Sequence, residues 1–280
     1  MVNRFLPRIG LAAILAAFSS AAFSTAQEEV DKQIAKLISD AISSRVSASV
    51  VSQTGAAMPS EPNNIWGSYG RAKIDFSAAG FSSNSRTNIY VGGYDRDITN
   101  SLILGASLSA SDTNNNGGKS WGISPYLAYK FTNSFFGIAT YSYSRTDFTG
   151  GNSDSNSLGA SLNFVHRAGD FLVKGRVGIT GGESKTNTVG FSTRSSSTSY
   201  VGDAEAGYFF VPGLYGFVGL QASDTNKSNG YNLFGRIGIE KEFNKNAAVS
   251  LRYEAKTDDN QPGGTSVKID TWTLAARFRF

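Results

Sequence analysis

The feature that most constrains this chain is an alternation of apolar and polar side chains with a period of two residues. It is clearest over residues 267–280, at the C-terminus. The apolar positions there are Trp272, Leu274, Ala276, Phe278 and Phe280, and the polar positions include Thr271, Thr273, Arg277 and Arg279. Such a strand has one apolar face and one cationic face, which a membrane barrel requires between lipid and a polar lumen.

The same period continues from Ile65 to the C-terminus and predicts twelve strands. Their expected ranges are 65–76, 87–96, 101–111, 119–130, 135–147, 157–167, 171–181, 199–211, 214–223, 231–243, 247–257 and 267–280. We therefore expect an all-β membrane barrel, specifically a 12-stranded antiparallel outer-membrane β-barrel.

The connections between these strands are sorted by length. Five short ones contain Asn, Asp, Gly or Pro at turn positions, and they are residues 97–100, 131–134, 168–170, 212–213 and 244–246. Six longer ones are rich in Ser, Asn, Gly and Thr, and they are residues 77–86, 112–118, 148–156, 182–198, 224–230 and 258–266. Short and long connections alternate, as in outer-membrane barrels with short periplasmic turns, long outer loops and both termini on the periplasmic side. A β-sandwich has no reason to sort its loops in this way.

Charged residues fall on the polar face of several strands, so we expect them to line the lumen. The predicted lumen-lining residues are Lys174, Arg176, Asp203, Glu205, Arg236, Glu240, Arg252, Glu254, Arg277 and Arg279. These groups could form an ion-pair network or bind a polar molecule inside the pore. The strands that begin at Thr87 and Phe135 are apolar on both faces, and the sequence does not assign their inward side.

Aromatic residues gather near the predicted strand ends, where amphipathic rings favour the level of the lipid headgroups. The candidates are Trp66, Tyr69, Tyr90, Tyr94, Tyr126, Tyr129, residues 208–210, Phe278 and Phe280. We expect two interfacial belts, although the general preference of aromatic residues for strands would give a similar pattern.

The first 64 residues do not show the period-two alternation of the barrel strands. Arg4 and Arg8, an apolar run and small residues before Gln27 predict a signal peptide over residues 1–26. Residues 27–50 repeat apolar side chains every three or four positions, which predicts one amphipathic helix. Residues 51–64 contain two prolines and no period, so they are expected to be a linker to the barrel at residues 65–280.

Composition narrows the possible functions. The chain contains no cysteine, so disulfides do not stabilise this exported protein. Removal of the signal peptide leaves 24 Lys and Arg against 22 Asp and Glu, and this balance gives no reason to expect nucleic-acid binding. No later segment is apolar for about eighteen residues, so no membrane helix is expected after the signal peptide.

No residue pattern predicts catalysis, a metal site or a cofactor. The single histidine, His166, continues the outward face of Phe164 beside a turn. Asp203 and Glu205 share one strand face, but a paired-carboxylate protease of this architecture would also need a histidine. One histidine and no cysteine do not supply the ligand set of a transition-metal site. We therefore expect a protein that is not an enzyme.

Residues 28–280 resemble the translocator domain of autotransporters. Residues 65–70 look like the opening strand of that family, residues 90–95 and 102–107 like its second hairpin, and residues 274–280 like its closing strand. The resemblance implies a helix threaded through the pore, outer-membrane lipids as surroundings, and an assembly signal read by the outer-membrane barrel assembly machinery. Within this sequence that signal would comprise Trp272, Phe278 and Phe280.

The chain departs from that family in one respect, because almost nothing separates the predicted cleavage site from the helix. A passenger of hundreds of residues is absent between Ala26 and Glu28, so export of an attached passenger is not expected.

The leading hypothesis is a surface protein of the Gram-negative outer membrane whose helix plugs its own pore. The alternatives are a small diffusion porin, in which Lys174, Arg176, Arg236, Arg252 and Arg277 give a mild anion preference, or an adhesin acting through residues 182–198. A barrel hydrolase using His166 or Asp203 is the weakest hypothesis.

Deletion of Phe280 should lower insertion into the outer membrane far more than an interior Phe→Leu replacement, because the terminal aromatic residue belongs to the expected assembly signal. The amount of heat-modifiable barrel in isolated outer membranes measures this effect. Equal insertion of the two variants would contradict the prediction.

Overall fold

The computed structural model describes one helix and the β-barrel. The described residues are 35–47, 63–78, 81–114, 118–188, 190–226, 231–244, 246–256 and 266–280. The predicted signal peptide, residues 1–26, lies outside them, as does most of the predicted linker. The helix covers residues 35–47, within the predicted range of 27–50. None of the described helical residues forms a helix long and apolar enough to cross a membrane.

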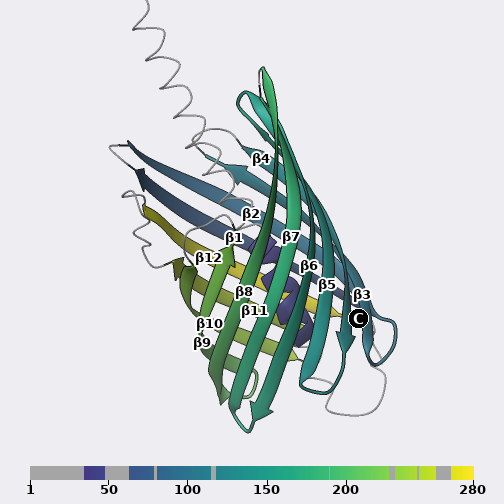
Figure 1. The fold of residues 1–280 in the computed structure, drawn as a ribbon. Coiled ribbons are helices and arrows are strands. Elements are labelled where there is room, and N and C mark those ends of the chain that lie inside the picture. The colour runs from purple at the N-terminus through teal and green to yellow at the C-terminus, as the bar shows by residue number, and fades with distance from the viewer. Residues whose placement is uncertain are drawn as a thin grey trace, which may run out of the picture.

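Within the described residues, twelve antiparallel strands form one closed barrel around the helix (Figure 1). They are β1 (Asn63–Ala78), β2 (Phe81–Asp97), β3 (Leu102–Thr113), β4 (Lys119–Lys130), β5 (Phe135–Phe148), β6 (Gly151–Ala168), β7 (Phe171–Thr188), β8 (Phe191–Val211), β9 (Leu214–Thr225), β10 (Asn232–Asn244), β11 (Ala247–Lys256) and β12 (Ser266–Arg279). Each strand pairs with its neighbours in sequence, and β1 pairs with β12. The predicted number, direction and closure of the strands are therefore confirmed.

The seam between β1 and β12 closes the barrel along its whole height. Its register runs from Asn64 opposite Arg279 to Ser77 opposite Ser266. Backbone hydrogen bonds also join Asn63 to Phe280 in both directions, at 3.0 and 2.9 Å. β1 thus begins at Asn63, two residues before the expected start, because the C-terminal residue supplies it with a partner. Closure leaves no unpaired backbone edge at the seam, as a lipid environment requires.

The structure assigns the two strands whose inward face the sequence left open. In β2, Ile89 and Val91 face the lumen and are almost fully buried, whereas Tyr90 is exposed on the outside. In β5, Phe136 and Ile138 face the lumen. These inward apolar residues form part of the cluster that packs around the helix.

One end of the barrel agrees with the predicted loop pattern and the other does not. The short connections are present as expected, for example between Val211 of β8 and Leu214 of β9. At the opposite end, three of the predicted long loops are mostly strand. β7 continues to Thr188 and β8 starts at Phe191, so residues 182–198 form a β-hairpin instead of a loop. Ser and Thr tolerate extended backbone when every ladder group has a partner, and composition alone did not reveal this pairing.

This difference makes the barrel uneven in height. β6 and β7 have 18 residues each and β8 has 21, whereas β9 has 12 and β11 has 10. The tip of the β7–β8 hairpin rises beyond β9 and β10 at the upper end of Figure 1. We call this the projecting end, and we call the end with Phe280 and the short turns the short-turn end.

Aromatic rings are exposed on the outer wall at two levels, with aliphatic side chains between them. Towards the projecting end these are Tyr69, Tyr90, Trp121, Tyr141, Tyr200, Tyr231 and Trp272, and towards the short-turn end they are Tyr94, Tyr129, Phe131, Phe135, Phe171, Tyr208, Phe210, Phe243, Phe278 and Phe280. Cross-strand ring pairs reinforce the first level, with Tyr69 and Tyr90 at 5.2 Å and Tyr253 and Trp272 at 4.8 Å. This arrangement is typical of lipid-facing barrels.

Three residues expected in these belts lie inside the barrel instead. Trp66 and Tyr126 are each 4% exposed, and Phe209 is also buried. The placement of Trp66 beside Tyr69 in one belt was wrong because residues three apart in a strand point to opposite faces. The same spacing separates Tyr126 from Tyr129.

The inward aromatic rings lie flat on glycines of neighbouring strands. Trp66 covers Gly93, and Tyr126 covers Gly105 so closely that a Cβ atom on Gly105 would lie 2.4 Å from the Tyr126 ring. Glycine therefore creates the space in which a large ring can face a lumen that also holds a helix.

Replacement of Gly105 by alanine should destabilise the barrel by roughly 1–3 kcal/mol, since the added methyl group forces Tyr126 out of its position. Gly202 is the matched control, because a Cβ atom there meets nothing within 4 Å. The temperature at which each purified barrel loses its folded gel mobility measures the difference. Equal temperatures for Gly105→Ala and Gly202→Ala would show that the contact has no energetic role.

Candidate functional site

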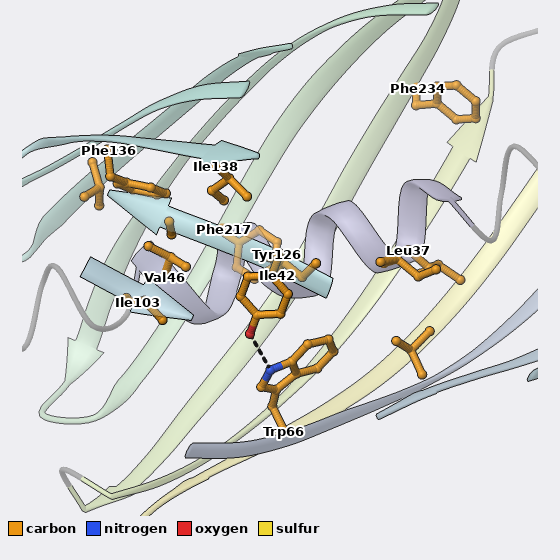
Figure 2. Close-up of a cluster of buried hydrophobic side chains, with 14 of the residues drawn as sticks. Leu37, Ile42, Val46, Trp66, Ile103, Tyr126, Phe136, Ile138, Phe217 and Phe234 are labelled. Carbon is orange, nitrogen blue, oxygen red and sulfur yellow. Dashed lines mark hydrogen bonds between the residues drawn. The ribbon is translucent and has the colours of Figure 1, made fainter. Parts of the chain in front are cut away.

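The helix of residues 35–47 lies inside the barrel and buries its apolar side chains against the wall. Leu37, Ile42 and Val46 are almost fully buried and face rings and aliphatic side chains of the lumen (Figure 2). Leu37 packs on Gly70 of β1, where a Cβ atom would lie 2.9 Å from its side chain. Burial of such side chains contributes about 1.5–3 kcal/mol each relative to exposure, so packing alone holds the helix strongly.

The end of the helix nearest the short turns is held by a buried carboxylate. Arg45 donates to Asp95 of β2 at 2.5 Å, and Asp95 is 0% exposed. Asp95 also accepts hydrogen bonds from Asn64 at 3.0 Å and from Tyr126 at 2.7 Å. The Trp66 indole donates to the Tyr126 hydroxyl at 3.2 Å, as the dashed line in Figure 2 shows. The three partners of Asp95 hold it so that one charged group of the helix meets one charged group of the wall.

The middle of the helix meets two arginines of the opposite wall. Asp40 accepts from Arg176 of β7 at 2.6 Å and lies 3.2 Å from Arg252 of β11. Arg176 also donates to Ser39 of the helix at 3.1 Å and to Asp203 of β8 at 3.2 Å. Asp40 thus joins the helix to strands β7 and β11, which are not neighbours in the barrel.

The end of the helix nearest the projecting hairpins is held by Lys36. Its ammonium group forms an ion pair with Glu254 of β11 and lies 4.1 Å from the centre of the Phe234 ring. Ser43, farther along the helix, donates to Asn163 of β6 at 2.7 Å. Polar contacts therefore reach β2, β6, β7 and β11, all around the lumen.

These contacts fix the direction of the helix. Glu254 lies two residues before β11 ends at the projecting end, whereas Asp95 lies two residues before β2 ends at the short-turn end. Lys36 therefore lies nearer the projecting end than Arg45. The expectation that both chain termini face the short-turn side holds for the barrel itself, but the described helix begins on the other side.

The ten predicted lumen-lining residues fall into three sets. Arg176, Arg252 and Glu254 touch the helix directly. A second set pairs wall to wall near the middle of the lumen, and comprises Lys174, Asp203, Glu205 and Arg236. The third set lies towards the short-turn end, where Arg277 pairs with Glu240 and Arg279 pairs with Asp97.

The wall-to-wall set neutralises its own charges. Arg236 donates to Asp203 at 2.7 Å and lies 3.5 Å from Glu205. Lys174 lies 2.7 Å from Glu205, which also accepts from Tyr215 at 3.3 Å. Pairing of this kind is necessary because an isolated charge in a shielded lumen has a high desolvation cost.

Sequence reasoning missed Asp95, the buried wall residue that pairs with Arg45 of the helix. Asp95 lies on β2, one of the two strands whose inward face the sequence did not assign. The alternation of apolar and polar residues in β2 is interrupted by Gly92 and Gly93. The polar positions Lys36, Asp40 and Arg45 were visible on the predicted helix, but their partners depend on the rotation of the helix in the lumen.

The helix does not fill the lumen completely. A partly enclosed gap of about 90 Å³ lies beside it. Hydroxyl groups of both sides line this gap, among them Ser43, Ser47, Ser250 and Thr273. Its walls combine hydroxyl and charged groups with apolar ones, and the polar groups offer hydrogen-bonding partners for water.

The residues considered for catalysis are not assembled into a reactive site. His166 is exposed on the outer wall and stacks with Phe164 at 6.2 Å between ring centres, as the alternation predicted. Asp203 and Glu205 are each bound by arginine or lysine. Among the described residues, no group of three potential metal ligands comes together. The geometry supports ion pairing and packing as the chemistry of this lumen.

The residues of the expected assembly signal lie on the outside of β12. Trp272, Phe278 and Phe280 are each more than half exposed to the surroundings of the barrel. Phe280 additionally pairs its backbone with Asn63, so it is part of the closing seam.

Comparison with solved structures supports the fold. The sequence matches no protein-family model and no curated protein. The translocator domain of the autotransporter NalP from Neisseria meningitidis is similar in structure, with a TM-score of 0.60, 12% identity, and coverage of 94% of this chain and 98% of that one. The β domain of the Bordetella autotransporter BrkA has a TM-score of 0.60 and 14% identity, with 79% and 100% covered.

Channels share the architecture more distantly. An outer-membrane channel from Pseudomonas putida F1 has a TM-score of 0.52 and 14% identity, with 81% of this chain and 98% of that chain covered. The fold is therefore that of an outer-membrane β-barrel, with translocator domains and channels among its structural neighbours. At these identities the likeness establishes the fold alone.

Replacement of Asp95 by alanine should destabilise the barrel by about 3–5 kcal/mol, because it leaves the Arg45 guanidinium buried without its carboxylate. Addition of Arg45→Met should restore much of this loss, since neither charge then remains. The temperature at which folded gel mobility is lost provides the measurement. Asp75→Ala is the matched control, because its pair with Lys73 is exposed. A loss no larger than that of the control would contradict the role of Asp95.

Proposed function

We propose that this chain is a non-enzymatic surface protein of the Gram-negative outer membrane whose own helix plugs its pore. The signal peptide at residues 1–26 would direct export, and residues 65–280 would insert as the barrel with help from the barrel assembly machinery. Outer-membrane lipids would surround the wall. No cofactor or nucleic acid has a part in this function, and the surface ligand is left unassigned.

The main support for a plugged pore is the set of ion pairs between the helix and separate parts of the wall. Asp40 and Arg45 lie about 1.4 helical turns apart, and their partners are on β7, β11 and β2. A helix resting at the mouth of the barrel would need only one such contact. Contacts on opposite sides of the lumen favour a helix that belongs in the pore as a structural element.

Plugging accounts for the lumen charges better than a diffusion porin with an anion preference. Each of the cations Lys174, Arg176, Arg236, Arg252 and Arg277 lies within 4 Å of a carboxylate. Among the carboxylates of the described residues, Arg252 pairs with Asp40 of the helix, whereas Arg176 pairs with both Asp40 and Asp203 of the wall. Removal of the helix would therefore expose nearly balanced charge, and we expect the open pore to conduct with little selectivity between anions and cations.

A role as an adhesin is the second candidate. The specific observation in its favour is the β7–β8 hairpin, which carries residues 182–198 beyond β9 at the projecting end. An ordered hairpin presents a fixed surface and loses less conformational entropy on binding than a flexible loop does. A plugged barrel with such a hairpin would serve as an anchor for surface contacts.

Deletion of residues 27–60 should raise the conductance of the purified barrel in planar bilayers severalfold, because it empties the lumen of its helix. The barrel with the unaltered helix should conduct only through the gap beside it. An unchanged conductance after the deletion would overturn the plug.

A disulfide provides a matched control for this deletion. The chain contains no native cysteine, and the side chains of Ser43 and Asn163 meet at 2.7 Å. The double variant Ser43→Cys/Asn163→Cys should stay at the low conductance when oxidised, since its helix is tethered to β6. A rise in conductance of the oxidised form would show that current flows without movement of the helix.

A further inference from the structure

Outward-facing cations of β1 and β2 lie just beyond the aromatic level nearer the projecting end. Tyr69 of β1 and Tyr90 of β2 belong to that level, and their ring centres are 5.2 Å apart. Side chains two residues apart in a strand share a face, so Arg71 follows Tyr69 on the outer wall and Arg86 lies beyond Tyr90. Both arginines are exposed. They therefore lie where the headgroups of the surrounding lipid begin.

The strand register brings these cations together. Lys73 of β1 lies directly opposite Arg86 of β2. Arg71 lies opposite Asn88, which is two residues from Arg86 along β2. Opposite side chains have Cβ atoms about 5 Å apart and diagonal ones about 7–8 Å apart, so these long side chains can reach a common point above the wall. Like charges in such positions destabilise a sheet, and an anion bound between them would offset the repulsion.

The carboxylates in this part of the outer wall have other partners. Asp75 is bound by Lys73 at 2.6 Å. Asp270 of β12 accepts a hydrogen bond from Tyr253 at 2.9 Å, and Asp112 of β3 lies opposite a lysine of β4. Among the described residues, no carboxylate oxygen lies within 4 Å of either arginine. The two guanidinium groups thus carry charge that this part of the wall leaves unbalanced.

Other arginines beyond the same aromatic level are paired with acids. Arg145 of β5 lies 3.2 Å from Asp147 and 3.9 Å from Asp154. Arg194 of β8 lies 3.5 Å from Glu183 of β7. The unbalanced charge on β1 and β2 is therefore a local feature of the outer wall and not a general property of the projecting end.

Asn88 adds hydrogen-bond donors beside the two arginines. Its side-chain oxygen accepts from the Tyr69 hydroxyl at 2.9 Å. The amide nitrogen of the same group carries two N–H donors, and within the described part of the chain it has no partner. Two guanidinium groups and one amide supply donors without acceptors, which suits a ligand that has several acceptor oxygens.

We propose that Arg71, Arg86 and Asn88 bind a phosphate group of an anionic lipid in the outer leaflet of the membrane. Guanidinium groups bind phosphate oxygens through paired hydrogen bonds, so arginine recognises phosphate with more geometric specificity than lysine does. The lipid is the glycolipid of that leaflet whose saccharide head carries phosphate groups. This inference rests on the proposed surface location, with the short turns in the periplasm and the projecting end outside.

The wall below the cations accommodates the rest of such a lipid. Towards the short-turn end, Leu274, Phe278 and Ile65 are exposed on the outer face of β12 and β1. Gly67 of β1 and Gly92 of β2 lie opposite each other and carry no side chain there. Acyl chains can lie against this apolar surface while the phosphate stays at the level of the arginines. A free phosphate ion makes no contact with that surface, so a lipid is the occupant that uses both parts.

Native mass spectrometry of the purified barrel with its helix, in a neutral detergent, tests this inference. The probes are lipid A with two phosphate groups, the same lipid without phosphate, phosphatidylglycerol and inorganic phosphate, each with a chelator that removes bridging divalent cations. We expect the parent chain to bind phosphorylated lipid A most tightly. The double variant Arg71→Gln/Arg86→Gln should weaken that binding by at least about tenfold, because two charge-assisted contacts are lost.

Arg145→Gln is the matched control, because it removes an outward arginine that carboxylates already pair. It should change the affinity by no more than about twofold. All variants should keep their folded gel mobility, since the replaced side chains are exposed. Equal binding by the double variant and the parent chain, or equal binding of lipid A with and without phosphate, would overturn the site.

Two further results would contradict the glycolipid as the occupant. Tighter binding of phosphatidylglycerol than of phosphorylated lipid A would assign the site to another lipid. Binding of inorganic phosphate as tight as that of lipid A would assign it to a free anion.

Labelling of Ser82→Cys on intact cells separates this inference from the orientation that it needs. Ser82 is exposed on the hairpin of β1 and β2 at the projecting end, and the chain contains no native cysteine. A membrane-impermeant maleimide should label this variant on intact cells. Labelled barrels without a preference for phosphorylated lipid A contradict the inference alone. Barrels that are labelled only after lysis contradict the proposed surface location and the inference with it.

Discussion

The pairing of β1 with β12 is the interaction on which the rest of this structure depends. Without it, twelve strands would form an open sheet with two edges, and no lumen would exist for the charged residues. Closure at this strand number creates an interior that accommodates one α-helix of about 10–12 Å diameter. Asn63 and Phe280 complete the seam with reciprocal backbone hydrogen bonds, so the first and last residues of the barrel sequence pair with each other.

Closure also determines the chemistry inside. A lumen shielded by protein makes unpaired charges costly, so the wall and the helix neutralise each other. Asp95 and Asp40 are the clearest cases, because each is buried and each meets an arginine across the boundary between wall and helix. Gly93 and Gly105 also adapt the wall to the helix. Without side chains, they make room for the rings of Trp66 and Tyr126 close to the wall and so leave space for the helix.

The sequence predicted the features that depend on neighbouring residues, and it did not predict those that depend on residues far apart in the chain. Alternation is local, so the twelve strands and the outward faces of residues such as Leu251 and Phe278 could be read directly. Pairing partners are not local, and the hairpin at residues 182–198 therefore looked like a loop. The charged lumen was predictable as a set, because its members share a strand face. Its connection to the helix through Asp95 was not, because helix rotation depends on packing against the whole wall.

The direction of the helix links the plug to the projecting hairpin. Lys36 lies towards the end of the lumen from which β7 and β8 project, and Phe280 lies at the other end. A chain inserted with its short turns in the periplasm would thus begin its described helix on the outer side. The same orientation places the tip of the β7–β8 hairpin outside the cell. Two features with no evident relation in the sequence then come together at the projecting end, namely the Lys36 end of the charged helix and the serine-rich hairpin. In the proposed function, the helix closes the pore and the hairpin presents a surface for contact.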